Sequence, residues 1–124
     1  MKILTKDDFN QVRLWMYRNA RQLELALWQY YFENGSKEAV LSALSIYRNE
    51  DGGFGHALEP DSWNPGSSPY TTLFAIKVLA GIEFFDKEHP ILRGILSFLN
   101  SNIYCSEEGW YFNIPSNDNY AHAP

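Results

Sequence analysis

Apolar residues recur at helical spacing along most of the chain, beginning with the segment 7–33. One face of that segment carries Phe9, Val12, Met16, Ala20, Leu23, Leu27 and Tyr30. Spacings of three and four residues are typical of an amphipathic helix. Further apolar side chains, such as Leu14 and Trp15, predict burial on much of its circumference. Because a single helix of this length is unusual, we expect a break near Arg18-Asn19 and an end at Asn34-Gly35.

Three shorter helices are predicted downstream. Ser36 is a typical N-cap for a helix reaching Tyr47, and Ser68-Pro69 has the N-cap and first-turn residues of a helix reaching Phe85. Pro90 begins a fourth helix, which runs to Asn100. The apolar positions expected to face inward on the first and last of these are Val40, Leu41, Leu44, Tyr47, Leu92, Ile95, Leu96 and Leu99.

Polar and glycine-rich segments separate these helices. The segment 104–112 predicts a turn leading to one short strand, too little for a sheet, and 114–124 has the composition of a loop. The segment 47–61 combines glycines, acids and a histidine. Its glycines suit a tight reversal. Asp51, Gly52, Gly53 and Phe54 are therefore predicted to form a structural turn, with the acid bonding backbone amides and the ring as an anchor.

The turn has a second, degraded copy. Asp51-Gly52-Gly53-Phe54 aligns with Glu108-Gly109-Trp110-Tyr111, so Gly109 and Trp110 are predicted to be structural as well. Self-similar units of about 50 residues built from two helices are typical of helical arrays. Chance similarity within a small helical bundle is the alternative.

These residues resemble the "QW" repeat of the α/α toroids, the family of squalene–hopene-type terpene cyclases and protein prenyltransferase β subunits. The segment 93–99 matches the front half of that repeat, and 49–54 matches the back half. Arg48 and Ile103 stand where the family has glutamine, and Phe54 replaces tryptophan. The resemblance implies an all-α fold of two or slightly more α-hairpins forming an incomplete toroid. We expect residues 1–124 to be one such domain, the N-terminal fragment of a longer chain, which would self-associate through exposed apolar faces.

Composition excludes several classes of function. The net charge is −5 with scattered Lys and Arg, which argues against a nucleic-acid surface or a polybasic membrane patch. No apolar run is long enough to span a membrane. The single cysteine, Cys105, precludes an internal disulfide, and no signal-peptide pattern is present, so we expect a cytoplasmic protein.

The candidate catalytic residues are His56, Glu59 and Asp61, which follow the repeated half of the turn. Two carboxylates beside a histidine suit general acid–base chemistry, or a divalent metal that no ligand motif supports. The structural alternative is that the acids cap amides or pair with Arg48, and that His56 packs on an aromatic ring.

Aromatic and hydroxyl side chains near the third helix are candidate substrate-binding residues: Trp63, Tyr70, Thr71 and Thr72. Trp63 is the stronger ligand candidate, whereas core packing is expected for Trp110. The two threonines would face a cavity or make ordinary bonds at the helix start.

Three functions remain open. The resemblance implies binding or transformation of a small-molecule isoprenoid in an aromatic-lined cavity, although the Asp-x-Asp-Asp run of the cyclases is missing. The zinc-ligand pattern of the prenyltransferases is not matched around Cys105 and His122 either. A carbohydrate-active toroid enzyme using Glu59 and Asp61 is the second hypothesis, and a non-catalytic helical-repeat binding module is the third.

Overall fold

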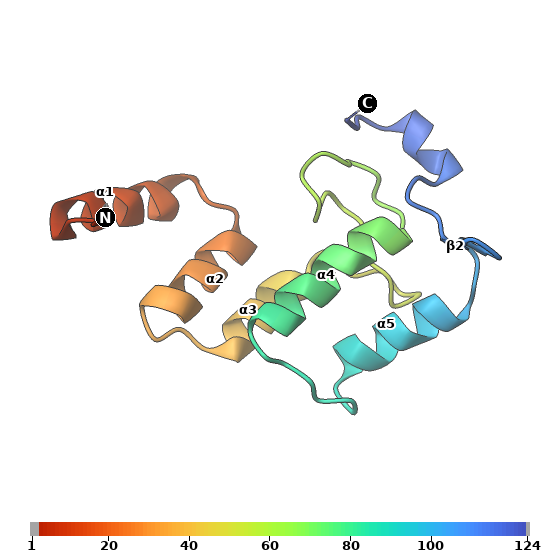
Figure 1. Cartoon of the computed structure of the whole chain (residues 1–124), viewed down its shortest axis with the longest axis horizontal. Coiled ribbons are helices and arrows are strands. Elements are labelled where there is room, and N and C mark those ends of the chain that lie inside the picture. The colour runs from red at the N-terminus through yellow and green to blue at the C-terminus, as the bar shows by residue number, and fades with distance from the viewer. Residues whose placement is uncertain (1–2, 124) are drawn as a thin grey trace. The chain divides into compact units, whose positions relative to one another are not determined.

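The computed structural model describes residues 3–123, which are mostly helical (Figure 1). The helices are α1 (Lys6–Asn19), α2 (Gln22–Phe32), α3 (Lys37–Ser45), α4 (Pro69–Gly81) and α5 (Pro90–Asn100), followed by strands β1 (Cys105–Ser106) and β2 (Gly109–Trp110) and the 3-10 helix η1 (Pro115–Asn119). The predicted predominance of helix is confirmed. Within residues 3–123, each helix is too short or insufficiently apolar to cross a bilayer. The chain divides into unit 1, Met1–Leu44, and unit 2, Ser45–Pro124.

The long N-terminal helical pattern is split into α1 and α2, so the predicted break is confirmed. It lies at Ala20 and Arg21, whose backbone is extended (ψ 145° and 161°). Thr5 caps α1 in a capping box: the Asp8 amide donates to Thr5 Oγ1 at 3.1 Å, and the Thr5 amide donates to the Asp8 carboxylate at 3.3 Å. This reciprocal pairing satisfies two backbone donors at the helix start.

Unit 1 is held together by an aromatic cluster and an ion pair between α1 and the end of α2. The Trp28 ring packs against Phe9 and Phe32, with centroid separations of 5.3 and 4.6 Å. Glu33 accepts from Tyr17 Oη at 2.5 Å and pairs with Arg13. These bonds lower the pKa of Glu33 below its ordinary value, the Tyr17 hydrogen bond contributing most.

The predicted burial of the N-terminal segment is wrong for α1. No residue of α1 is buried, and Trp15 is 60% exposed. Within unit 1, α2 covers only one stripe of α1, which leaves the wider apolar face uncovered. The next cap is as predicted: Ser36 Oγ accepts from the Ala39 amide at 3.1 Å, and Val40, Leu41 and Leu44 of α3 are buried.

Phe54 is the structural centre of unit 2. Its ring is fully buried, and its backbone lies between Arg48 and Ser68 in two antiparallel bridges. The Phe54 amide donates to Thr72 Oγ1 at 3.1 Å, and the Phe54 carbonyl accepts from the Ser68 amide at 3.2 Å. The turn is thereby fixed to the first turn of α4.

Helix α5 packs directly on this turn through Gly94. A Cβ built on Gly52 would lie 2.1 Å from the Gly94 carbonyl oxygen, so the two backbones are in contact. The predicted inward face of α5 is confirmed at Ile95 and wrong at Leu96, while Leu92 and Leu99 are half-buried. The buried residues are Ile91, Ile95 and Phe98, whereas Leu96 is 53% exposed. The helix presents its glycine side to the turn, which leaves Leu96 exposed and Leu92 and Leu99 at the margin of the core.

Helix α4 begins as predicted but ends early. Ser68 Oγ accepts from the Thr71 amide at 3.0 Å, with Pro69 in the first turn. The helix was expected to reach Phe85 but ends at Gly81. Glu83 has a positive φ of 53°, and its amide donates to the Ala80 carbonyl, so the helix ends here. Ile82, the residue after Gly81, is buried.

The segment after α5 is more ordered than predicted. Strands β1 and β2 pair antiparallel, so a minimal sheet replaces the single strand expected there. The described part of the tail contains η1, and Ile114 before it is 2% exposed. The prediction of a plain loop is therefore wrong for this part, because Ile114 gives the tail an apolar anchor. Pro124 lies outside the described residues.

Candidate functional site

Two adjoining clefts in unit 2 form the candidate site. The apolar cleft, of about 280 Å³, is lined by Pro69, Tyr70, Leu73, Ile76, Leu99, Trp110, Tyr111 and Phe112. The polar cleft, of about 380 Å³, is lined by Glu59, Asp61, Ser62, Tyr70, Phe112, Asn113, Asn117, His122 and Ala123. Tyr70 and Phe112 belong to both, and their ring centroids are 4.2 Å apart. This ring pair therefore forms the boundary between an apolar and a polar compartment.

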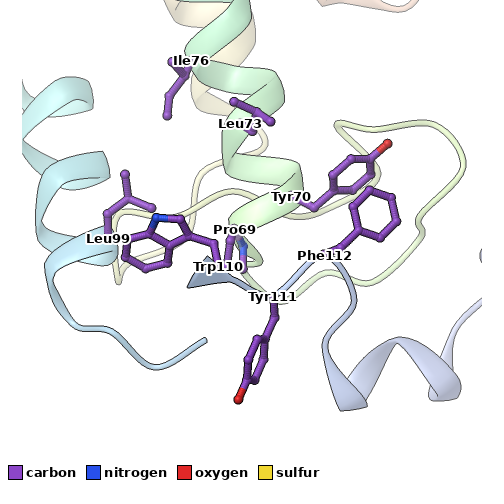
Figure 2. Close-up of a pocket in the computed structure, with 8 residues that line it drawn as sticks. All are labelled: Pro69, Tyr70, Leu73, Ile76, Leu99, Trp110, Tyr111 and Phe112. Carbon is purple, nitrogen blue, oxygen red and sulfur yellow. The ribbon is translucent and has the colours of Figure 1, made fainter. Parts of the chain in front are cut away.

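Helix α4 forms one side of the apolar cleft and strand β2 with the following residues forms the other. In Figure 2 the Trp110 indole lies beside Leu99, and the Phe112 ring faces Tyr70, while the Tyr111 ring points away from both. Leu73 and Ile76 come from successive turns of α4. Trp110 is 48% and Leu73 42% exposed, so these apolar side chains remain available to a ligand.

The polar cleft depends on an unusual backbone path after Gly55. His56 and Ala57 both adopt positive φ, at 56° and 58°. The Leu58 amide then donates to the Gly55 carbonyl at 3.1 Å, closing a tight turn. Two successive non-glycine residues with positive φ are uncommon. The result is that Leu58 enters the core at 3% exposure and Glu59 follows it into the cleft wall at 8%.

The tail completes the polar cleft by pairing with the loop that carries the acids. The Trp63 amide donates to the Ala121 carbonyl, and the Ala123 amide donates to the Asp61 carbonyl, both at 2.9 Å. The Asn64 side chain donates to Ser116 and Asn117, in both cases at 2.8 Å. These bonds bring His122 and the asparagines opposite Glu59 and Asp61.

Glu59 is electrostatically unusual. The residue is 8% exposed and lines the polar cleft, yet within residues 3–123 its carboxylate has neither a hydrogen bond nor an ion pair. Arg48, the partner considered from the sequence, pairs with neither Glu59 nor Asp61 in the described chain. In the described chain, Trp28 Nε1 is the buried side-chain polar atom that lacks a partner, so the Glu59 carboxylate keeps some accessible surface.

The structure brings together two of the three predicted catalytic residues. Glu59 and Asp61 line the same cleft, with Glu59 buried and Asp61 exposed. His56 does not line it. Its Nε2 lies 2.8 Å from the Asn49 Oδ1, and the ring is exposed. Acid–base chemistry in the polar cleft would therefore draw on the two carboxylates and His122 rather than on His56.

Of the predicted substrate-binding residues, only Tyr70 lines the clefts. Trp63 is 65% exposed, and its indole Nε1 donates to the Pro60 carbonyl at 3.1 Å. Thr71 and Thr72 are buried and bonded locally: the Thr71 hydroxyl lies 3.0 Å from Ser68 Oγ, and Thr72 accepts from Phe54. The Thr71 bond is the helix-start alternative considered from the sequence, whereas the Thr72 bond reaches 18 residues back to the turn.

The predicted structural turn has the geometry expected of it. Asp51 Oδ1 accepts from the Gly53 amide at 2.9 Å and from Ser67 Oγ at 2.7 Å. Gly52 has a φ of 87°, and its counterpart in the second copy, Gly109, has a φ of 125°. The anchors differ, however: Phe54 is fully buried, whereas Trp110 is half exposed in the apolar cleft rather than packed in the core.

Sequence reasoning missed the tail and Phe112 as parts of the site. His122 was considered only as a zinc ligand beside Cys105, and the asparagines carried no motif. The available signal was Ile114, one apolar residue in a polar segment, which indicated that the tail packs on the domain. Among residues 3–123, no group of three His, Cys, Asp or Glu side chains is arranged to hold a metal ion.

The chain matches no family model, no curated protein and no solved structure.

Proposed function

We propose that this protein binds a small isoprenoid-type ligand in the apolar cleft, as a member of the α/α-toroid proteins. The observation that carries the proposal is the half-exposed aromatic and aliphatic lining contributed by α4 and β2. Small-molecule sites are concave and predominantly apolar, with few polar groups. The cleft volume of about 280 Å³ suits a short chain of roughly ten carbons better than a large polycyclic product.

The toroid assignment is supported by the repeated turn. Gly52 and Gly109 occupy equivalent positions in the two copies and both have positive φ. Each turn also follows a helix, α3 or α5, as a two-helix repeat requires. Phe54 is buried in the first turn, whereas Trp110 is half exposed in the second. In a repeat protein, this difference leaves an apolar surface at the second copy that can contact a further group.

Titration calorimetry with geraniol tests the proposal. We expect saturable binding that is lost by at least tenfold in Leu73→Asp, because a charge in the apolar lining would be desolvated by the ligand. Leu96→Asp is the matched control, since Leu96 is comparably exposed on α5 but does not line the cleft. Absence of geraniol binding, or equal losses in both variants, would contradict the proposal.

Carbohydrate binding is the second candidate, favoured by the two carboxylates and two asparagines beside the Tyr70–Phe112 pair. Sugar rings stack on aromatic faces while their hydroxyls bond to such groups. Cello- and xylo-oligosaccharides in the same calorimetric assay distinguish the candidates. Binding of oligosaccharides but not of geraniol would favour this second function.

A further inference from the structure

The polar cleft carries a charge that the described protein does not neutralise. Glu59 lines the cleft and is more than nine-tenths buried, and its carboxylate, whose oxygens keep accessible surface, has no bonding partner among residues 3–123. Asp61 adds a second carboxylate to the lining, and no Lys or Arg contributes to it. His122, Asn113 and Asn117 complete the polar lining, so a ligand group meets two carboxylates beside one histidine and two neutral amides.

Two aromatic side chains line the same cleft as Glu59. Tyr70 and Phe112 line both clefts and are tilted by 48° to each other. A cation placed over an aromatic face is attracted by the ring quadrupole, more strongly where water is excluded. Carboxylate and rings together are complementary to an organic ammonium group, and both disfavour a diphosphate.

We infer that Glu59 anchors an ammonium group carried by an apolar chain, with the chain lying in the apolar cleft. This inference rests on the proposed function in one respect, namely that the apolar chain of the ligand lies in the apolar cleft. The ammonium subsite itself depends only on Glu59, Asp61 and the two rings. The ligand class is accordingly a prenyl or alkyl amine of about ten carbons.

The first test compares three geranyl compounds that differ only in head group: geranylamine, geraniol and geranyl diphosphate. Calorimetry should rank them in that order, with the amine about ten- to a hundredfold tighter than the alcohol, as a charge-assisted bond in a desolvated site provides. Glu59→Gln should erase the advantage of the amine while leaving geraniol affinity unchanged. Asp61→Asn, which alters the exposed carboxylate of the same cleft, should reduce that advantage by less.

The second test separates this inference from the proposed function. Ethylammonium has only two carbons and cannot occupy the apolar cleft, so saturation-transfer NMR with it reports the ammonium subsite alone. We expect a signal in the wild type that Glu59→Gln removes. If no geranyl compound binds but this signal is present, the proposed function fails and the subsite stands. If geraniol binds and the amine shows no Glu59-dependent advantage, the inference is overturned and the proposed function stands.

A stability measurement without ligand guards against a structural role for Glu59. Because the Glu59 carboxylate makes no hydrogen bond or ion pair within residues 3–123, the thermal midpoint of Glu59→Gln should equal or exceed that of the wild type. If the carboxylate instead held the fold together, the variant would melt earlier. An earlier midpoint, or loss of the folded state, would overturn the inference.

Discussion

Replacing Gly52 with alanine tests the contact that joins the turn at residues 51–54 to α5. The new Cβ would lie 2.1 Å from the Gly94 carbonyl oxygen and 2.5 Å from its carbon. Ordinary contacts between such atoms are longer by more than 1 Å. Neither partner is a flexible side chain, so the turn and α5 must separate. That separation disturbs Ile95 and Phe98, which are 3% and 4% exposed.

The expected cost has two parts. Alanine at a φ of 87° carries a backbone strain of about 1–2 kcal/mol. Forcing extra volume into a packed contact adds about 1–3 kcal/mol. A gain of roughly 0.4–1 kcal/mol from the stiffer unfolded chain offsets part of this. We therefore expect Gly52→Ala to lower the free energy of unfolding by about 3 kcal/mol, a large share of a typical domain's stability.

Gly109→Ala is the matched control. Gly109 also has a positive φ, but a Cβ built on it meets no atom within 4 Å. The control therefore contains the strain and the unfolded-state gain without the steric overlap, and its net cost should be about 1 kcal/mol. Urea unfolding followed by circular dichroism gives both values. Equal losses in the two variants would refute the contact between the turn and α5.

Two further substitutions test individual bonds. Thr72→Val removes the acceptor of the buried Phe54 amide without changing shape, so we expect a loss of about 1–3 kcal/mol in urea unfolding; a larger loss in Thr72→Ser, which keeps the hydroxyl, would contradict this. Tyr17→Phe removes the strongest cause of the lowered Glu33 pKa. A depressed carboxyl pKa stabilises the fold above the unfolded value of 4.5 and stops doing so as pH falls through the folded value. The wild type should therefore exceed this variant in stability at pH 7, and the difference should shrink below pH 4.5; a pH-independent difference would count against the Glu33 bond.

Local signals in the sequence were sufficient for the starts of α3, α4 and α5. Ser36, Ser68 and Pro90 were read correctly because capping and proline effects depend on a few adjacent residues. The buried face of α5 was predicted incorrectly, for a specific reason. Ile91, Gly94, Ile95 and Phe98 form one stripe at helical spacing. A count of apolar side chains omits the glycine, and the choice then falls on the neighbouring stripe of leucines.

Only the part of the candidate site formed by the loop with Glu59 and Asp61 could be predicted from the sequence. Glu59 and Asp61 stood out because they lie in a polar loop without a copy in the repeat. Their partners in the cleft come from the tail, through pairing of Ser62 with His122. No periodicity links such distant segments, since the pairing depends on where Ile114 packs in three dimensions. The exposure of α1 was mispredicted for the same kind of reason. A sequence shows which residues are apolar, but it does not show how many helices pack against them.

Positive φ angles occur in both halves of the segment 47–61, but they cost little in one half and more in the other. In the repeated half, a positive φ falls on Gly52, where it costs little. In the unrepeated half, positive φ falls on His56 and Ala57, where each costs about 1–2 kcal/mol. That strained path leads to Glu59, whose carboxylate has no partner in residues 3–123. Backbone strain and polar groups without partners gather where structure serves something other than stability. Their coincidence on one loop is a physical reason, independent of the repeat, to look for the ligand beside Glu59.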